Sequence, residues 1–419
     1  MSDTVQETGS SSTGSTRGEV MVPRISIDWY RSTPWWRLVS QSVSISWRTS
    51  HVLLCAAALL ITQIGFNISQ KVFIGSASSS SAQTESTATQ WLHPKTSNVP
   101  IAPWVPGVDG LSEVMLGSQQ KSDWYRFNSD SFVAIWQRYA SVAYEMLDGT
   151  ALRGGIAFGS FAAGVWNIFW VVGVWGMVGG LLARRSVQEL GLKITAPWVE
   201  TVRWVQGRWL SIVWSVLMPL SLVASIALLP WGIGWISNAT WVGGALASIL
   251  MIPIVFLGLG LGWVCAISLF GFSFSTVSIV TENKADAFDG MSRATAYTFQ
   301  RPATLFLGVC IAEALGYFSS SIVSIVLNTG YNLVAQSFHA SSAFALQSEG
   351  NWLAFIVRGM VPLLITAYGF SFFWTASSAL YLVLRKEIDH AEFDAISMKN
   401  DDEPKALPKL APVPGSEGA

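Results

Sequence analysis

A long uncharged stretch in the middle of the chain constrains the fold most. From Trp241 to Val280 there is no Asp, Glu, Lys or Arg. As one α-helix this stretch would extend roughly 60 Å, about twice the thickness of the hydrocarbon core of a bilayer. Because every backbone polar group must be satisfied inside lipid, the stretch predicts membrane helices.

The composition supports the same class of protein. Charged residues make up 12% of the 419 residues, which is about half the fraction typical of soluble domains. The chain also contains 21 Trp and 36 Gly. Trp favours the headgroup level of a membrane, and Gly is frequent in spanning helices. The formal net charge of −1 gives no indication of nucleic-acid binding.

Six segments contain about 20 predominantly apolar residues, the length that crosses a bilayer as a helix. They lie near residues 51–67, 156–183, 209–232, 248–277, 304–327 and 352–384. We therefore predict an all-α fold, a polytopic transmembrane helical bundle of about six spans with amphipathic surface helices. The uncharged stretch 241–280 is long enough for two spans. Within it, LGLGLGW (Leu257–Trp263) would be either a bend or a close-packing face.

The positions of Lys and Arg predict the orientation, because basic residues collect in cytoplasmic loops. With six spans, every short basic connector lies on one side of the membrane. With seven, the connector that follows the uncharged stretch would change side. The basic residues concerned are Arg17, Arg24, Arg31, Arg37 and Arg48, then Arg184, Arg185, Lys193, Arg203 and Arg208, then Lys284, Arg293 and Arg301, and finally Arg385 and Lys386. We choose six spans with both termini cytoplasmic.

The predicted organisation has five parts, two of which are disordered tails rich in Ser, Thr, Gly or Pro. The parts are 1–27 (N-terminal tail), 28–67 (interfacial helix and first span), 68–152 (extracytoplasmic loop), 153–396 (five-span membrane core with two cytoplasmic surface helices) and 397–419 (C-terminal tail). Inside the loop, apolar residues from Phe132 to Met146 recur at helical spacing. This pattern predicts an amphipathic helix that either lies on the outer surface or packs against the bundle.

The segment ADAFDGMSRATAYTFQRP (residues 285–302) is the most charged connector in the second half of the chain. The residues that define it are Asp286, Asp289, Arg293, Tyr297 and Arg301. In a helix, Asp289 and Arg293 form an i,i+4 pair with the acid first, which is the favourable order. Asp286 would begin the helix, where the macrodipole favours an acid. We predict a cytoplasmic surface helix, with a ligand-binding site as the alternative.

Two ionisable residues are predicted to lie at membrane depth, Glu313 in the fifth span and Arg358 in the sixth. Such residues are costly in lipid and often functional. In one interpretation they form an interhelical pair or line one polar cavity. In the other, Arg358 extends to the outer headgroups, and Glu313 bonds to a serine such as Ser319 or to the backbone.

The sequence contains no motif for a catalytic, cofactor-binding or metal-binding site. There is no HExxH, GxSxG or Walker motif. The four His residues (His51, His93, His339 and His390) are scattered, and the three Cys residues (Cys55, Cys265 and Cys310) lie in apolar runs. We therefore expect no enzyme activity, no cofactor and no bound metal.

Three stretches carry a resemblance to known proteins: VWGMVGGLLARRSVQELG, ADAFDGMSRATAYTFQRP and ALYLVLRKEIDHAEFDAI. From about Pro34 to Ile396 the chain resembles a family of uncharacterised bacterial multi-pass inner-membrane proteins. More distantly, it is similar to the membrane domain attached to some glycerophosphoryl diester phosphodiesterases. The resemblance implies a helical bundle in the bacterial cytoplasmic (inner) membrane and supplies no catalytic residues. The chain lacks a phosphodiesterase domain, so the resemblance does not imply that activity.

The sequence thus predicts a non-enzymatic membrane scaffold or complex subunit. The alternative is a transporter or flippase-like protein with a polar path at Glu313 and Arg358. The expected partners are membrane lipids and a protein that binds the extracytoplasmic loop, with no nucleic acid, and the oligomeric state is unknown. A polar cavity that reaches Glu313 would favour transport, whereas a solid, dry bundle would favour the scaffold.

Overall fold

The computed structural model describes residues 35–74, 131–147, 158–239, 241–283, 285–340 and 352–396. All of these residues belong to one compact unit, Trp35–Ala419. The predicted tails 1–27 and 397–419 and most of the predicted extracytoplasmic loop lie outside the described residues.

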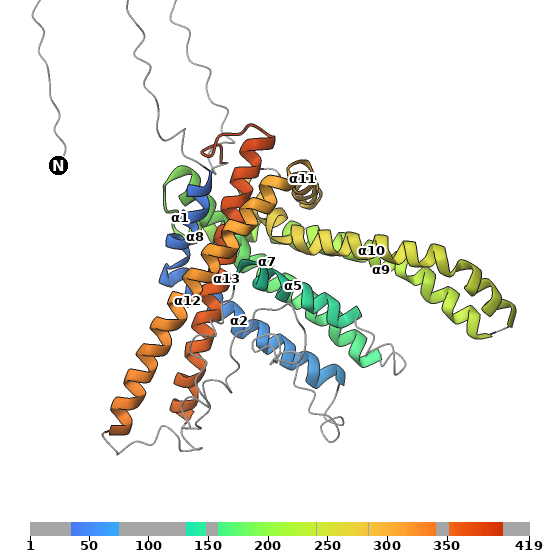
Figure 1. Cartoon of the computed structure of the whole chain (residues 1–419), viewed down its shortest axis with the longest axis horizontal. Coiled ribbons are helices and arrows are strands. Elements are labelled where there is room, and N and C mark those ends of the chain that lie inside the picture. Colours follow the sequence, from blue (N-terminus) through green and yellow to red (C-terminus); the bar gives the residue numbers. More distant parts are fainter. Residues whose placement is uncertain are drawn as a thin grey trace, which may run out of the picture. The chain divides into compact units, whose positions relative to one another are not determined.

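Every regular element in the described residues is helical (Figure 1), which confirms the predicted all-α bundle. The short helices are α1 (Trp36–Ser46), α5 (Phe132–Leu147), α8 (Trp198–Gln206) and α11 (Ala287–Gln300), with the π-helical turns η1 (Gln70–Ile74) and η3 (Gln188–Leu192). The long helices are α2 (Thr49–Ser69), α7 (Phe158–Val187), α9 (Trp209–Ala239), α10 (Trp241–Thr281), α12 (Pro302–Ala340) and α13 (Trp352–Ile388).

Five helices in the described residues are long and apolar enough to cross a bilayer, as is typical of a multi-pass membrane protein. The five segments are Thr49–Phe73, Phe161–Leu192, Trp209–Ile226, Pro302–Val334 and Met360–Ile388. They overlap five of the six predicted spans. The remaining predicted span, 248–277, falls on α10, where the described residues contain two shorter apolar segments, Ile252–Val264 and Gly271–Thr281.

Helix α10 is continuous from Trp241 to Thr281, so the uncharged stretch does not fold back into two spans. It lies alongside α9 (Figure 1). The glycines of its LGLGLGW segment do not interrupt the helix, and they do not pack within the described chain either. A Cβ atom added at Gly258, Gly260 or Gly262 would have no other atom within 4 Å.

One order of elements occurs three times in the described residues: a short helix, a first long helix and a second long helix. The three sets are α1–α2–α7, α8–α9–α10 and α11–α12–α13, with α5 between α2 and α7 in the first. In each set an arginine stands immediately before the first long helix, and its carbonyl accepts the first i+4 hydrogen bond. These bonds join Val52 N to Arg48 O (3.1 Å), Ile212 N to Arg208 O (3.1 Å) and Leu305 N to Arg301 O (3.0 Å). The described residues therefore repeat one order of helices three times along the chain.

The second long helices α7, α10 and α13 contact one another, and α5 contacts all three. The buried ring of Tyr139 in α5 lies 5.6 Å from the ring of Trp175 in α7 and 5.7 Å from that of Phe272 in α10. It also lies 5.6 Å from the ring of Phe370 in α13. The indole N–H of Trp374 donates a 3.2 Å hydrogen bond to the Tyr139 hydroxyl. Of the two predicted positions for this amphipathic helix, the structure therefore has the one packed against the bundle.

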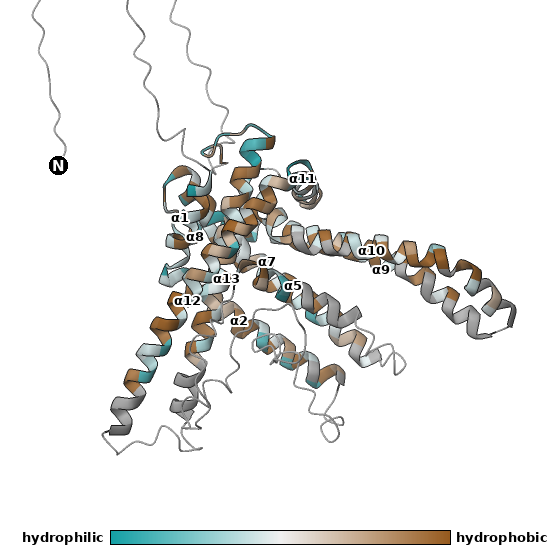
Figure 2. Ribbon diagram, in the orientation of Figure 1, coloured by the Kyte–Doolittle hydropathy of each residue, from teal (hydrophilic) through white to brown (hydrophobic). Residues whose placement is uncertain are grey.

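The polar and apolar parts of the bundle are separated along the helices. Figure 2 shows hydrophilic residues at α11 and at the C-terminal end of α13, whereas α9 and α10 are predominantly hydrophobic. Large apolar side chains of α10 are exposed, for example Ile249 (73%) and Phe256 (69%). A surface as apolar as this requires lipid or another protein to cover it.

Candidate functional site

Helix α11 begins as its local chemistry predicts. Asp286 is the N-cap residue in an extended conformation, and its carboxylate accepts a 2.8 Å hydrogen bond from the N–H of Asp289. The bond satisfies one of the free N–H groups of the first turn, and the macrodipole stabilises both carboxylates. At the other end, Arg301 is exposed and precedes Pro302, which starts α12.

Arg293 links α11 to two other helices. Its Nη1 donates to Oε1 of Glu282, directly after α10. Its Nη2 lies 3.7 Å from Oδ2 of Asp289, and its Nη1 lies 3.9 Å from Oδ2 of Asp389, directly after α13. A second base, Arg385, approaches Glu282 with Nε 3.7 Å from Oε1. These five residues form what we call the acid-rich junction. The i,i+4 pair of the sequence analysis is one contact within it.

The charges of the acid-rich junction are perturbed by partial burial. Burial raises the pKa of Glu282, and the two nearby arginines oppose this change without reversing it. Burial also opposes the charge of Arg293, but the carboxylate of Glu282 and other neighbouring acids outweigh it and raise the pKa of Arg293. The guanidinium of Arg293 therefore stays charged. The partial burial of the Glu282 carboxylate costs the folded state some stability.

Tyr297 faces the bundle and is only 1% exposed. Its hydroxyl donates to Oδ2 of Asp389, and its ring lies 5.5 Å from the ring of Tyr381 in α13. Burial raises the pKa of Tyr297, so the phenol remains a protonated donor. The close approach of α11 to α10 depends on Gly290, where an added Cβ would lie 2.6 Å from Cγ1 of Ile279. The face of α11 that carries Arg293 and Tyr297 is thus a docking face within the chain.

Glu313 of α12 contacts the start of α5. Its Oε2 accepts a 2.8 Å hydrogen bond from the backbone N–H of Val133. The N–H of Ala134 donates at 3.4 Å to the hydroxyl of Ser131. A carboxylate at a helix N-terminus satisfies a free donor and is stabilised by the macrodipole. Arg358 lies on α13, but its side chain is outside the described residues, so the Glu313–Arg358 pair stays a prediction.

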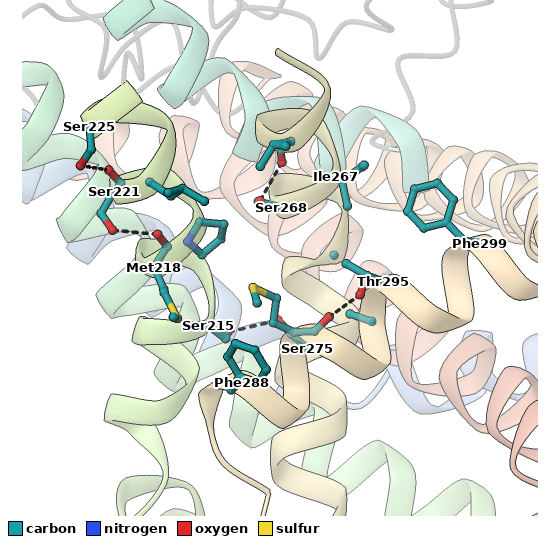
Figure 3. Close-up of a pocket in the computed structure, with 16 residues that line it drawn as sticks. Ser215, Met218, Ser221, Ser225, Ile267, Ser268, Ser275, Phe288, Thr295 and Phe299 are labelled. Atoms are coloured by element: carbon teal, nitrogen blue, oxygen red, sulfur yellow. Dashed lines mark hydrogen bonds between the residues drawn. The ribbon is translucent and has the colours of Figure 1, made fainter. Parts of the chain in front are cut away.

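A cavity of about 610 Å³ lies between α9, α10 and α11 (Figure 3). It is lined by Ser215, Met218, Pro219, Ser221, Leu222 and Ser225 of α9, Val264, Ile267, Ser268, Gly271 and Ser275 of α10, and Phe288, Met291, Ala294, Thr295 and Phe299 of α11. Its volume lies in the range of sites for small molecules. Glu313 does not line it.

The hydroxyls around this cavity already have partners in their own helices (Figure 3). They donate to carbonyls one turn back: Ser215 to Ile212, Ser221 to Met218, Ser225 to Ser221, Ser268 to Val264, Ser275 to Phe272 and Thr295 to Met291. Ser215 and Ser275 are also within 3.2 Å of each other across the two helices. A polar molecule would gain little from hydroxyls that are already satisfied, so the cavity favours an apolar occupant such as an acyl chain.

The sequence analysis singled out α11 but not this cavity. A signal was present, since serines recur in two otherwise apolar helices and small polar residues are frequent where membrane helices meet. Which serines would line a cavity depends on how α9, α10 and α11 pack together, and this packing is not encoded in the spacing of any one helix.

Among the described residues, no group of three or more His, Cys, Asp or Glu side chains could hold a metal ion. No protein-family model, curated protein or solved structure matches the chain. The resemblance to inner-membrane proteins and to phosphodiesterase membrane domains therefore stays a prediction.

Proposed function

We propose that the chain is a non-enzymatic scaffold, or a subunit of a larger complex, in a bacterial cytoplasmic membrane. The observation that carries the proposal is the open glycine surface of α10. Gly258 and Gly262 stand in a G-x-x-x-G pattern on one face, and an added Cβ at either would have no atom within 4 Å. Such a pattern lets two membrane helices approach closely. A helix of a partner protein would bury this surface.

The acid-rich junction supports a structural role for the charged residues. Its ion pairs join the ends of α10 and α13 to α11, and the guanidinium of Arg184 donates a 2.9 Å hydrogen bond to the carbonyl of Val280. These contacts hold the ends of the long helices together. The hairpin of α9 and α10 is then free to present its apolar surface to lipids and to a partner. A second partner contact, through the extracytoplasmic loop, belongs to the same proposal.

A paired glycine substitution tests the scaffold. Gly258→Leu with Gly262→Leu should abolish the association of the chain with its membrane complex, because the larger side chains keep the partner helix away. The measurement is the size of the complex on native gels after mild solubilisation, and the matched control is Gly330→Leu in α12. Gly330 also has no atom within 4 Å of an added Cβ but lacks the glycine pattern. If the complex survives the double substitution, this surface is not the scaffold contact.

We also propose that both termini are cytoplasmic. The basic residues near the helix ends, such as Arg184 and Arg185 in α7 and Arg385 and Lys386 in α13, support this orientation. Cysteines placed at the exposed positions Arg203 and Arg301 should both react with a membrane-impermeant reagent only from the cytoplasmic side. Labelling of the two from opposite sides would overturn the orientation.

Transport through a polar path at Glu313 and Arg358 is the alternative function. It is motivated by an acid at membrane depth, but the bond from Val133 gives the Glu313 carboxylate a structural role. Glu313→Gln distinguishes the transport role from the structural role, because an amide oxygen still accepts the hydrogen bond from Val133 while the charge is lost. Transport by reconstituted protein that disappears in this variant without loss of folding would favour the alternative.

A further inference from the structure

A second cluster of charged residues lies where α2 begins, α7 ends and α8 begins. We call it the base-rich junction, and it consists of Gln41, Arg48, His51, Arg185, Glu189, Lys193 and Trp198. It contains three cationic side chains, from Arg48, Arg185 and Lys193, against the single carboxylate of Glu189. This excess of positive charge distinguishes it from the acid-rich junction.

Within the base-rich junction only one of the three cations pairs with the acid. Arg48 donates through Nη2 to Oε1 of Glu189. Lys193 donates a 2.8 Å hydrogen bond from Nζ to Oε1 of Gln41. The guanidinium of Arg185 instead lies over the ring of Trp198, 4.2 Å from its centroid.

Polar atoms of three residues here are buried without a hydrogen-bond partner among the described residues. His51 is 0% exposed, and neither of its ring nitrogens has a partner. Its ring is edge-on to Trp198 at 5.9 Å. The Nε and Nη1 atoms of Arg185 and the Oε2 atom of Glu189 are in the same condition. A buried charged donor that makes no hydrogen bond is costly, and an acceptor from outside the chain would remove that cost.

The chemistry of these groups indicates what the acceptor is. Unpaired N–H groups of a guanidinium form a planar fork that matches the oxygens of a phosphate or carboxylate. Imidazole adds a donor beside it. The base-rich junction adjoins the ends of the candidate spans Thr49–Phe73 and Phe161–Leu192, the depth at which lipid phosphates lie. Indole rings such as that of Trp198 also favour this depth.

We propose that the base-rich junction binds a phosphate group through Arg185 and His51, with Arg48 and Lys193 adding positive charge. The phosphate belongs either to a lipid headgroup or to a small phosphate compound in solution. Glu189 acts against the anion and limits its affinity. The site is independent of the glycine surface of α10 and of the cavity between α9, α10 and α11.

The test uses the full chain purified in a neutral detergent. Phosphatidylglycerol or inorganic phosphate is titrated at constant ionic strength, and binding is read from native mass spectrometry for the lipid and from calorimetry for phosphate. Arg185→Gln should weaken binding about tenfold or more, the effect of losing a charge-assisted hydrogen bond. The charge-matched control is Arg301→Gln, which removes an exposed arginine directly before α12, outside the base-rich junction, and should leave binding unchanged.

A second variant keeps the test decisive if Arg185→Gln fails to fold. Glu189→Gln removes the one carboxylate and should tighten binding several-fold. Binding of the lipid with both expected shifts identifies a headgroup site, and binding of phosphate alone with the same shifts identifies a soluble ligand. If neither probe binds, or if binding ignores both substitutions, the proposal is overturned.

Discussion

The two charged junctions occupy comparable places at the ends of long helices but have opposite charge balances. In the acid-rich junction, three carboxylates surround the guanidiniums of Arg293 and Arg385. The base-rich junction has three cations and one carboxylate, that of Glu189, which pairs with Arg48. In each junction one arginine Nε atom is buried without a hydrogen bond, in Arg385 and in Arg185. The Arg385 guanidinium still lies within ion-pair distance of Glu282, whereas Arg185 has no ion pair in the described residues and lies over the ring of Trp198. The comparison distinguishes charged residues whose ion pairs join helices, such as Arg293, from a charged residue without an ion pair in the described residues, Arg185.

The pKa shifts of the two junctions differ in the same sense. Neighbouring acids raise the pKa of Arg293 despite its burial. At the base-rich junction, burial lowers the pKa of Lys193, and Glu189 offsets this only in part. A cation at the first junction is therefore stabilised by folding, and a cation at the second is disfavoured by it.

The largest expected effect is the contrast between Arg293→Gln and Arg185→Gln. Arg293→Gln leaves partly buried carboxylates without their counter-charge and should lower the free energy of unfolding by about 2–3 kcal/mol. Arg185→Gln, measured without phosphate or anionic lipid, should lower it by no more than about 1 kcal/mol, because the cation–π contact with Trp198 is lost but no ion pair is. Unfolding in mixed micelles measures both. Equal losses would remove the distinction between the junctions.

A smaller effect is expected at Glu313, where the chain also supplies its own partner. Glu313→Ala should destabilise the protein by about 1–2 kcal/mol, since it removes the acceptor for the Val133 N–H at the start of α5. Glu313→Gln should retain most of that stability. The comparison of the two unfolding free energies is the measurement, and equal losses would show that the charge, and not the acceptor, is what α5 requires.

These two sites also show how far the sequence predicts the structure. The all-α bundle and the start of α11 at Asp286 follow from short-range patterns, namely apolar run length and the spacing of an N-cap acid. The burial of Tyr297 does not, because its partner Asp389 is 92 positions away along the chain. The contact between Val133 and Glu313 spans 180 positions. An acid in an apolar span indicates that a partner exists, but it does not indicate which distant helix supplies it.

The same reasoning explains why the base-rich junction was not predicted. Arg48 and Glu189 are 141 positions apart and lie in connectors that the sequence analysis used only to orient the chain. In the sequence His51 is one of four scattered histidines, and a single sequence does not show that the starts of α2 and α8 meet. In the folded chain, His51 and Arg185 both contact the ring of Trp198.

The hydrogen bond between Tyr297 and Asp389 gives a third, weaker test of the acid-rich junction. Tyr297→Phe and Asp389→Asn should each destabilise the protein, and the double variant should lose about 1 kcal/mol less than the sum. The coupling arises because either substitution alone removes the bond. Additive losses in unfolding measurements would show that the bond contributes nothing to the docking of α11.

The smallest expected effect is a dependence on alkaline pH. Because burial raises the pKa of Tyr297 above its unfolded value, its contribution to stability is complete below the unfolded value of about 10 and is lost as the pH rises through the folded value. Phenylalanine does not ionise, so the advantage of the natural chain over Tyr297→Phe should shrink above pH 10. Half a unit above that pH the change should be just under about 1 kcal/mol.

The measurement is the difference in unfolding free energy between the natural chain and Tyr297→Phe at several pH values. Between pH 6 and 8 the difference should be constant, which provides the internal control. A difference that stays constant up to pH 10.5 would mean that the phenol is not held protonated in the folded state. Tyr297 would then lie in a more hydrated environment than its 1% exposure indicates, and the contrast between the two junctions would weaken accordingly.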